Sequence, residues 1–227
     1  MATRAKAVPK AIGPRSATRG LVADAKARRY DPAETRGRVV EAAYQLFATR
    51  GYAATGTADI ARAADVSEGS IFYHFGSKRA LLGELGRLHG EKMVAAMQGV
   101  DALKDLEPGI NIRRCFAFCL ENETWEKMSD ASPDCPGKHE HNPEAAPFYQ
   151  AAREVVVGWV TDQLTIAYAH RGITGVDPAI AAALTFTAVG DAMHMFFAPD
   201  ADDARRLHVQ EQCVGFARRA YGFPDAN

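Results

Sequence analysis

The sequence has few of the features that mark membrane, secreted or disulfide-rich proteins. No apolar run reaches the roughly 18 residues that a helix needs to cross a bilayer, and no hydrophobic signal region follows Met1. The four cysteines give no disulfide framework in a chain of 227 residues, and they fit reduced, intracellular thiols. We therefore expect a soluble, cytoplasmic protein without a membrane partner.

Sequence signatures of enzymes are also missing. The chain has no glycine-rich phosphate loop, no His-Glu-x-x-His pair and no Gly-x-Ser-x-Gly elbow. The acidic residues Glu121, Glu123 and Glu126 read as an ordinary charged helix face. We expect no enzymatic activity and no cofactor. A C-terminal domain with catalytic activity on a small hydrophobic substrate stays open as an alternative, which turnover of a candidate ligand would support.

Strand-like alternation and internal repeats do not stand out, whereas apolar residues recur at helical spacing along most of the chain. The sequence therefore predicts an all-α protein. With 47% hydrophobic residues, it can bury one good core or a small domain joined to a larger one.

The net charge of −1 conceals a strong asymmetry along the chain. The formal charge is +7 over residues 1–30, zero over residues 31–90 and −8 over residues 91–227. An anionic polymer should therefore meet the N-terminal end and be repelled by the C-terminal end. We divide the chain into three parts at these boundaries.

Residues 1–30 are rich in alanine, lysine, arginine and proline, with little apolar periodicity, so we expect a flexible basic arm. Its cations can follow DNA phosphates or enter a minor groove; they include Arg15, Arg19, Lys26, Arg28 and Arg29. A solvated tail, a misassigned start codon and a cationic transit peptide are the other interpretations.

Residues 31–90 contain the pattern of a helix-turn-helix. Apolar spacing predicts a helix over 35–50 that stops at Gly51, and a second from Gly56 or Thr57 through residue 64. After a break at residues 65–67, Ser67 can cap a third, short helix, and Ser77 can cap the next one. Two short helices around so tight a turn are typical of helix-turn-helix domains.

The third helix carries unusually many aromatic residues. Helical spacing predicts that Ile71, Phe72 and Phe75 pack inward. Ser70, Tyr73 and His74 are then left on an outer face, where their hydroxyl and imidazole groups can reach phosphates and base edges.

These residues resemble the TetR family of one-component transcriptional regulators. The resemblance extends over about fifty residues. It consists of Ala42-Ala43-Tyr44-Gln45-Leu46-Phe47, Gly51-Tyr52, Thr55, Ile60-Ala61, Val66-Ser67, Gly69-Ser70-Ile71-Phe72-Tyr73-His74-Phe75, Ser77-Lys78 and Leu81-Leu82. Two positions depart from the family, which usually has Ser or Thr in place of Gly56 and Tyr in place of Phe72. Phenylalanine has no hydroxyl to donate, so the phosphate contact of that tyrosine is in doubt.

The resemblance implies an N-terminal three-helix DNA-binding head with the start of a linking helix in residues 31–90, and a helical effector-binding and dimerisation domain in residues 91–227. It implies a regulator, most often a repressor, that acts as a homodimer on a palindromic double-stranded DNA operator and is released by a small hydrophobic effector. An architectural DNA-binding protein without a ligand switch is the alternative.

The DNA-binding residues expected from the pattern and the resemblance lie at the start of the second helix and along the third. They are Thr57, Ser67, Glu68, Gly69, Ser70, Tyr73, His74 and Lys78. Glu68 is expected to accept from a cytosine amine, and Gly69 to let the backbone approach a groove. Thr57, Tyr73, His74 and Lys78 are expected to bind phosphates.

Five more helices are predicted: one from residue 77 to before Pro108, one over 108–129, a long helix from about 148 to 171 closed by Gly172, one from 177 to about 197, and one over 201–221. The last two are expected to form the dimer interface. A three-proline stretch at 132–143 is predicted to be a loop.

Aromatic, methionine and histidine residues of this region are the candidate walls of an effector pocket, or alternatively part of an ordinary core. They are Phe116, Phe118, Trp125, Phe148, Tyr149, Trp159, Met193, His194 and Phe196. In the loop, Cys135, His139 and His141 are close enough to bind a divalent metal, although their spacing matches no strong template. Solvated side chains are the other interpretation, and we expect no metal.

Overall fold

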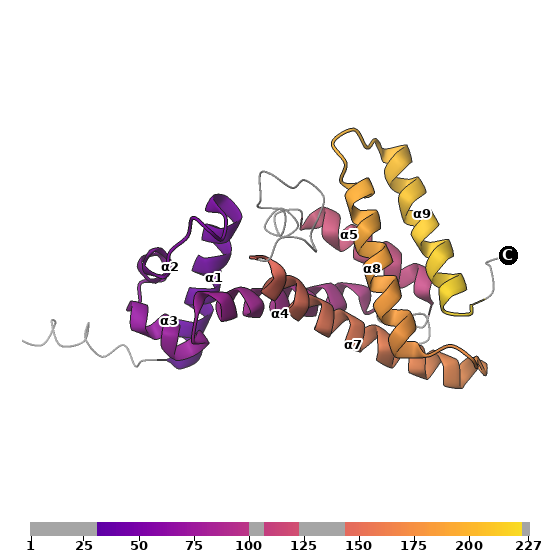
Figure 1. Cartoon of the computed structure of the whole chain (residues 1–227), viewed down its shortest axis with the longest axis horizontal. Helices are drawn as coiled ribbons and strands as arrows, with labels where there is room; N and C mark the ends of the chain where they lie inside the picture. The colour runs from indigo at the N-terminus through magenta and orange to yellow at the C-terminus, as the bar shows by residue number, and fades with distance from the viewer. Residues whose placement is uncertain (1–30, 100–106, 123–143, 224–227) are drawn as a thin grey trace, which may run out of the picture.

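The computed structural model describes residues 31–99, 107–122 and 144–223, and all of the regular secondary structure in these ranges is α-helical. The helices are α1 (Pro32–Arg50), α2 (Thr57–Ala64), α3 (Glu68–Phe75), α4 (Lys78–Met97), α5 (Pro108–Glu121), α7 (Ala146–Arg171), α8 (Pro178–Phe196) and α9 (Asp203–Ala220). The all-α prediction is confirmed. Helices α1, α2 and α3 form a separate head at one end, and α5, α8 and α9 lie at the other end (Figure 1).

The predicted serine caps are present in the head. The side chain of Ser67 accepts a hydrogen bond from the backbone N–H of Ser70 at 3.2 Å, and that of Ser77 accepts one from Ala80 at 3.0 Å. Helix α2 begins at Thr57 after Gly56, as predicted. These caps place α3 between two sharp changes of chain direction.

Helix α1 begins three residues before the predicted start, at Pro32. Asp31 caps it, with a carboxylate oxygen that accepts from the backbone N–H of Ala33 at 2.8 Å. Proline suits the first turn because its missing N–H is not needed there. The first helix therefore includes residues 32–34, which the apolar spacing did not assign to it.

Among the helix ends after residue 107, the end of α7 and the start of α8 are capped as predicted, and the end of α5 is not. Gly172 ends α7 in the left-handed conformation at φ 66°, and Asp177 caps α8 through the N–H of Ala179 at 2.9 Å. Helix α5, however, ends at Glu121 and not near residue 129. Asn122 ends it because its side-chain amide donates to the carbonyl oxygen of Phe118 at 2.8 Å.

Two hydrophobic clusters are built around α4. Its first half contributes Leu81, Leu82 and Leu85 to a cluster with α1, α2 and α3, and its second half contributes Met93 and Met97 to a cluster with α5, α7, α8 and α9. Helix α4 therefore continues through the predicted boundary at residue 90 and belongs to both parts of the molecule.

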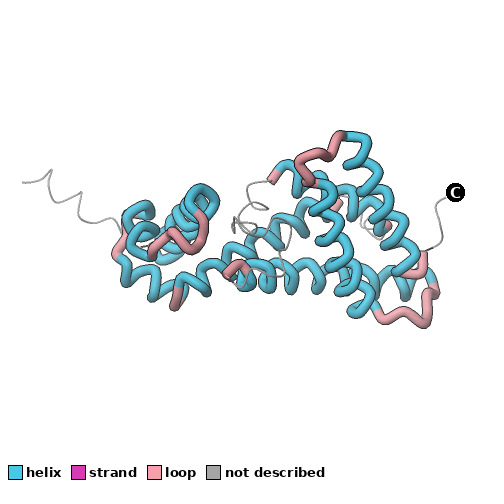
Figure 2. Tube along the Cα trace, turned by 45° about the horizontal axis from the view of Figure 1, so that its top comes forward, coloured by secondary structure: helices cyan, strands magenta, loops and turns pink. Residues whose placement is uncertain are grey.

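Helices α4 and α7 lie side by side in both views (Figures 1 and 2). Their backbones approach closely at two glycines of α4. A Cβ atom on Gly86 would lie 2.1 Å from the carbonyl oxygen of Phe148, and one on Gly90 would lie 2.9 Å from that of Ala152. Only glycine fits such an approach without a shift of the backbone. This contact brings the start of α7 against the half of α4 that adjoins the head.

Candidate functional site

The exposed face of α3 consists of Glu68, Gly69, Phe72 and Tyr73. Tyr73 is 76% exposed and Phe72 is 49% exposed, so the prediction that Phe72 packs inward is wrong. At 100° per residue these four positions fall on one side of the helix. Ile71, which is fully buried, falls on the other side.

Ser70 and His74 lie at the edge of this face, and both are half-buried. The ring of His74 meets that of Tyr73 edge-on, with 5.0 Å between their centres. The outer face predicted from Ser70, Tyr73 and His74 is therefore shifted around the helix, towards Glu68 and Phe72.

Two polar contacts hold the start of α3. The hydroxyl of Thr57, the first residue of α2, donates to the carboxylate of Glu68. The hydroxyl oxygens of Ser67 and Ser70 lie 2.8 Å apart and share a hydrogen bond. Four predicted DNA-binding side chains are thus brought together, and the exposed Glu68 carboxylate is oriented before any DNA arrives.

Lys78 lies against the loop between α1 and α2. Its ammonium group donates to the carbonyl oxygens of Tyr52 at 2.9 Å and Thr55 at 3.0 Å, and it sits 4.1 Å from the centre of the Tyr52 ring. An ammonium group has three donors, so one is left for a phosphate. The structure gives Lys78 a role in the head that the sequence did not suggest.

Ion pairs join the head to α4. Arg36 of α1 lies 2.7 Å from the carboxylate of Glu84, which also binds Arg87 at 2.6 Å. The hydrogen bonds from Arg87 and Arg36 hold the pKa of Glu84 below its usual value. The Arg36–Glu84 contact therefore links α1 to α4.

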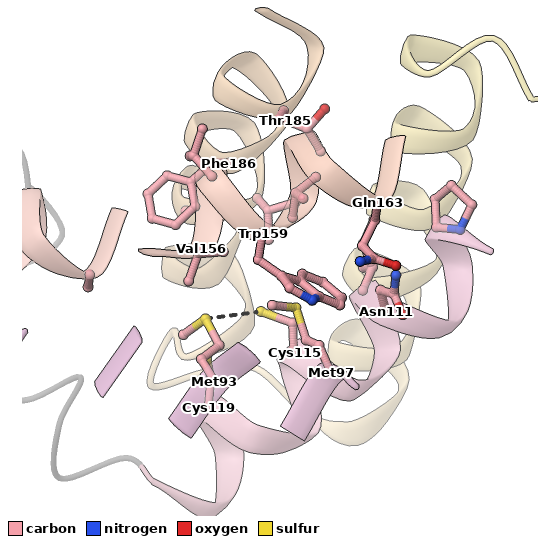
Figure 3. Close-up of a pocket in the computed structure, with 18 of the residues that line it drawn as sticks. Met93, Met97, Asn111, Cys115, Cys119, Val156, Trp159, Gln163, Thr185 and Phe186 are labelled. Atoms are coloured by element: carbon pink, nitrogen blue, oxygen red, sulfur yellow. Dashed lines mark hydrogen bonds between the residues drawn. The ribbon is translucent and has the colours of Figure 1, made fainter. Parts of the chain in front are cut away.

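A cavity of about 150 Å³ lies between α4, α5, α7 and α8 (Figure 3). Four predicted effector-binding residues line it: Phe148, Tyr149, Trp159 and Met193. Its mainly apolar wall with a few polar groups is typical of a small-molecule site. The structure therefore contains a cavity in the part of the chain where an effector pocket was expected.

The other described candidates do not line this cavity. Phe116 is fully buried and meets Phe196 with 4.9 Å between ring centres, while Phe118 lies 5.3 Å from the His89 ring. His194 is half-buried outside the cavity. These residues fall on helix faces that meet other parts of the core. Trp125, Cys135, His139 and His141 lie outside the described residues.

Polar residues in the cavity wall were not predicted. They are His89, Asn111, Gln163, Thr185 and Tyr221. No local pattern in the sequence singles them out, because their helices carry many other polar residues. The sulfur atoms of Met93 and Cys115, 3.8 Å apart, also belong to the wall (Figure 3).

Burial shifts the pKa values of two residues in the cavity wall, His89 and Tyr221. His89 is 4% exposed, and burial, with a smaller effect of Lys92, lowers its pKa to about 4. Burial raises the pKa of Tyr221 to about 12. Among the described residues, no lysine, arginine, aspartate or glutamate lines the cavity. At neutral pH the described wall therefore carries no net charge.

Residues 39–85 match the sequence model of the bacterial regulatory proteins of the tetR family. This range holds α2, α3 and the Thr57–Glu68 contact. The head of the chain is therefore similar to the TetR family. The identification made from residues 42–82 is confirmed.

Curated transcriptional regulators with a helix-turn-helix match this chain in the head. The transcriptional regulator TtgR of Pseudomonas putida is 39% identical over 77 residues, which are 32% of this chain and 36% of the relative. The transcriptional repressor KstR2 of Rhodococcus jostii is 36% identical over 77 residues, 32% of this chain and 38% of the relative. The matched region thus spans little more than a third of each relative.

Solved structures share the fold over most of the chain. A TetR-family transcriptional regulator from Syntrophomonas wolfei has a TM-score of 0.65 at 14% identity, covering 87% of this chain and all of that one. The flavonoid-responsive regulator FrrA has a TM-score of 0.58 at 20% identity, covering 83% and 97%. At these identities the likeness extends to the fold alone and not to the residues of the cavity.

Proposed function

We propose that the protein is a transcriptional repressor that binds a palindromic DNA operator through α3 and is released when a small hydrophobic molecule occupies the cavity. One observation carries this proposal: α4 contributes residues both to the head and to the cavity wall. Its first turn places Lys78 on the head, and its later turns place His89, Met93 and Met97 in the cavity wall. A molecule that moves α4 also moves the head.

The exposed face of α3 supports the DNA-binding half of the proposal. It offers one oriented carboxylate, one phenol and one apolar ring in a row, with Gly69 leaving room for close approach. Acceptors read base amines, hydroxyls bind phosphates, and apolar groups contact thymine methyls. The curated relatives are named transcriptional regulators or repressors, which supports this role and a cytoplasmic location.

Exposed apolar side chains on α8 and α9 support a homodimer. Ile180 and Leu184 of α8 are 61% and 64% exposed, and Leu207 and Phe216 of α9 are 58% and 44% exposed. The two helices run side by side at the end away from the head (Figure 1). Scattered exposed leucines are ordinary, but several on two adjacent helices are typical of an interface. A dimer through these helices leaves both α3 helices free for the two halves of a palindrome.

Helix α8 is also the one described helix whose length and composition would let it cross a membrane, with 33% of its residues buried. We propose instead that its outer face is covered by the second subunit. Ion-paired helices such as α4 and α5 surround the same core, and a membrane around α8 would leave their charges in hydrocarbon.

DNA binding and release together test the proposed function. Double-stranded DNA selected from a random pool should converge on an inverted repeat, and fluorescence anisotropy should measure its affinity. A compound that raises the melting temperature should then weaken the DNA complex by about 5–150-fold, the usual range of allosteric coupling. Selection without a consensus would favour the architectural alternative.

The Trp159→Ala variant separates release through the cavity from competition at the DNA surface. Trp159 lines the cavity and lies far along the chain from α3. The variant should respond less to the compound while its DNA affinity stays nearly unchanged. A compound that binds free and DNA-bound protein equally well cannot be the inducer, because linkage requires the same factor in both directions.

A further inference from the structure

We propose that the effector is a small uncharged molecule with a single-ring, lipophilic body and one hydrogen-bonding substituent, such as an amide, hydroxyl or carbonyl group. The inference rests on the proposed function, because it concerns the same cavity. It follows from three properties of the wall: its charge, its size and the position of its polar groups.

The described part of the wall offers no charge that would stabilise an ionised effector. The described lining residues are all neutral at pH 7, including the buried His89. The arginines of α5 are engaged elsewhere, since Arg113 binds Glu211 at 2.7 Å and Arg114 donates to the carbonyl oxygen of Met97 at 2.8 Å. An ion that leaves water for a site without a counter-charge loses several kcal/mol of solvation. Carboxylates and ammonium ions therefore bind poorly here.

The size and composition of the cavity favour one ring. A volume of about 150 Å³ is similar to that of engineered apolar cavities that hold benzene. Aromatic side chains and thioethers contribute to the wall, among them Trp159, Phe186, Met93 and Met97 (Figure 3). Sulfur atoms make favourable contacts with aromatic ring edges, and methionines adapt to an irregular ligand. A substituted benzene fits both the space and the surface.

The polar groups of the wall select a substituent. The carboxamides of Asn111 on α5 and Gln163 on α7 point towards one another beside the Trp159 indole (Figure 3). A carboxamide both donates and accepts, so this pair matches a ligand group that does the same. Thr185 adds a buried hydroxyl to the wall, beside the Tyr221 phenol with which it interacts.

Three compounds of nearly equal shape test whether the cavity prefers an uncharged ligand: benzamide, benzoate and benzylammonium. Calorimetric titration of the full-length protein at pH 7 should give a dissociation constant for benzamide at least tenfold lower than for either ion, or about 1.4 kcal/mol. Benzoate or benzylammonium binding as tightly as benzamide overturns the inference. Absence of benzamide binding at millimolar concentration overturns it as well.

Two leucine variants on α7 test whether Gln163 binds the polar substituent of the ligand. Gln163→Leu should weaken benzamide about tenfold and leave toluene, which has no polar group, nearly unchanged. Gln150→Leu, an exposed position on the same helix, should change neither affinity. Equal effects of Gln163→Leu on benzamide and toluene would mean that Gln163 acts through packing alone, against the inference.

A DNA measurement separates failure of this inference from failure of the proposed function. If benzamide binds as expected but leaves the affinity for selected DNA unchanged, the ligand class stands and the release mechanism is wrong. If benzoate alone binds and releases the DNA, the release mechanism stands and the ligand class is wrong.

Discussion

Gly86 lies directly against the carbonyl group of Phe148, so closely that a Cβ atom on Gly86 would come within 2.1 Å of that oxygen. Phe148 also belongs to the hydrophobic cluster of the head, lines the cavity, and lies 5.4 Å from the His89 ring. The contact therefore joins the cavity to the head through backbone atoms, which cannot rearrange as side chains do.

Replacement of Gly86 by alanine should destabilise the protein. The added methyl group has to push α4 and α7 apart, and overpacking of this kind typically lowers the free energy of unfolding by about 1–3 kcal/mol. Gly83→Ala is the matched control, because its Cβ atom would lie 3.7 Å from the nearest atom, an ordinary contact. Alanine should be neutral there, or stabilise the helix by about 0.5–1 kcal/mol. Urea unfolding of both variants measures the difference, and equal stabilities would show that the helices are not tightly apposed.

Acidification should destabilise the protein through His89. Its pKa is about 4 in the folded state and 6.5 as a reference, so the unfolded state binds more protons between these values. Stability is therefore unaffected by His89 above pH 6.5 and falls as the pH drops towards 4. Between pH 7 and pH 5 the loss should be about 2 kcal/mol.

Urea unfolding at pH 7 and pH 5 measures this effect. The His89→Gln variant should show a correspondingly smaller difference between the two pH values, whatever its own stability at pH 7. His170→Gln, at an exposed position of α7, should keep the pH dependence of the parent. If the stability of His89→Gln falls between pH 7 and pH 5 as much as that of the parent, other groups cause the loss of stability in acid.

Phe72 should contact a thymine methyl group in the operator. It is the apolar member of the exposed α3 face, and apolar side chains read that methyl in the major groove. Replacement of the contacted thymine by deoxyuridine removes one methyl group, which should weaken binding about fourfold, or ~0.8 kcal/mol. The Phe72→Ala variant should bind both DNA molecules equally. Fluorescence anisotropy should measure the affinity for a series of DNA molecules, each with one thymine of the site replaced by deoxyuridine. If no replacement weakens binding of the parent protein, the proposed contact of Phe72 is wrong.

Leu184→Glu should convert the proposed dimer into a monomer. Leu184 is 64% exposed on α8, and a carboxylate there would have to be buried without a partner when the two subunits meet. Ile166→Glu is the control, because Ile166 is similarly exposed, at 54%, but lies on α7. Sedimentation velocity at micromolar concentration distinguishes the states. A monomeric parent protein, or a dimeric Leu184→Glu variant, would show that α8 is not the interface.

The sequence by itself determined the local features. Ser67, Ser77 and Asp177 cap their helices as predicted, because a cap joins a side chain to a backbone N–H two or three residues away. The family could be identified for the same reason, since its residues form one short, continuous stretch. The prediction failed locally at the start of α1, where Asp31 caps the helix before the predicted start, and at the end of α5, where Asn122 supplied a cap that the apolar periodicity did not reveal.

The tertiary structure decided which helix faces meet. The sequence predicted that Phe72 was inside and that Phe116 was in a pocket, and both depend on neighbours that belong to other helices. The cavity takes His89 from α4, Gln163 from α7 and Thr185 from α8, residues that no local pattern brings together. Their meeting depends on the distance between α4 and α7, which Gly86 and Phe148 set by backbone contact. Periodicity gives the apolar side of each helix, but packing determines whether that side closes into a core or leaves a cavity.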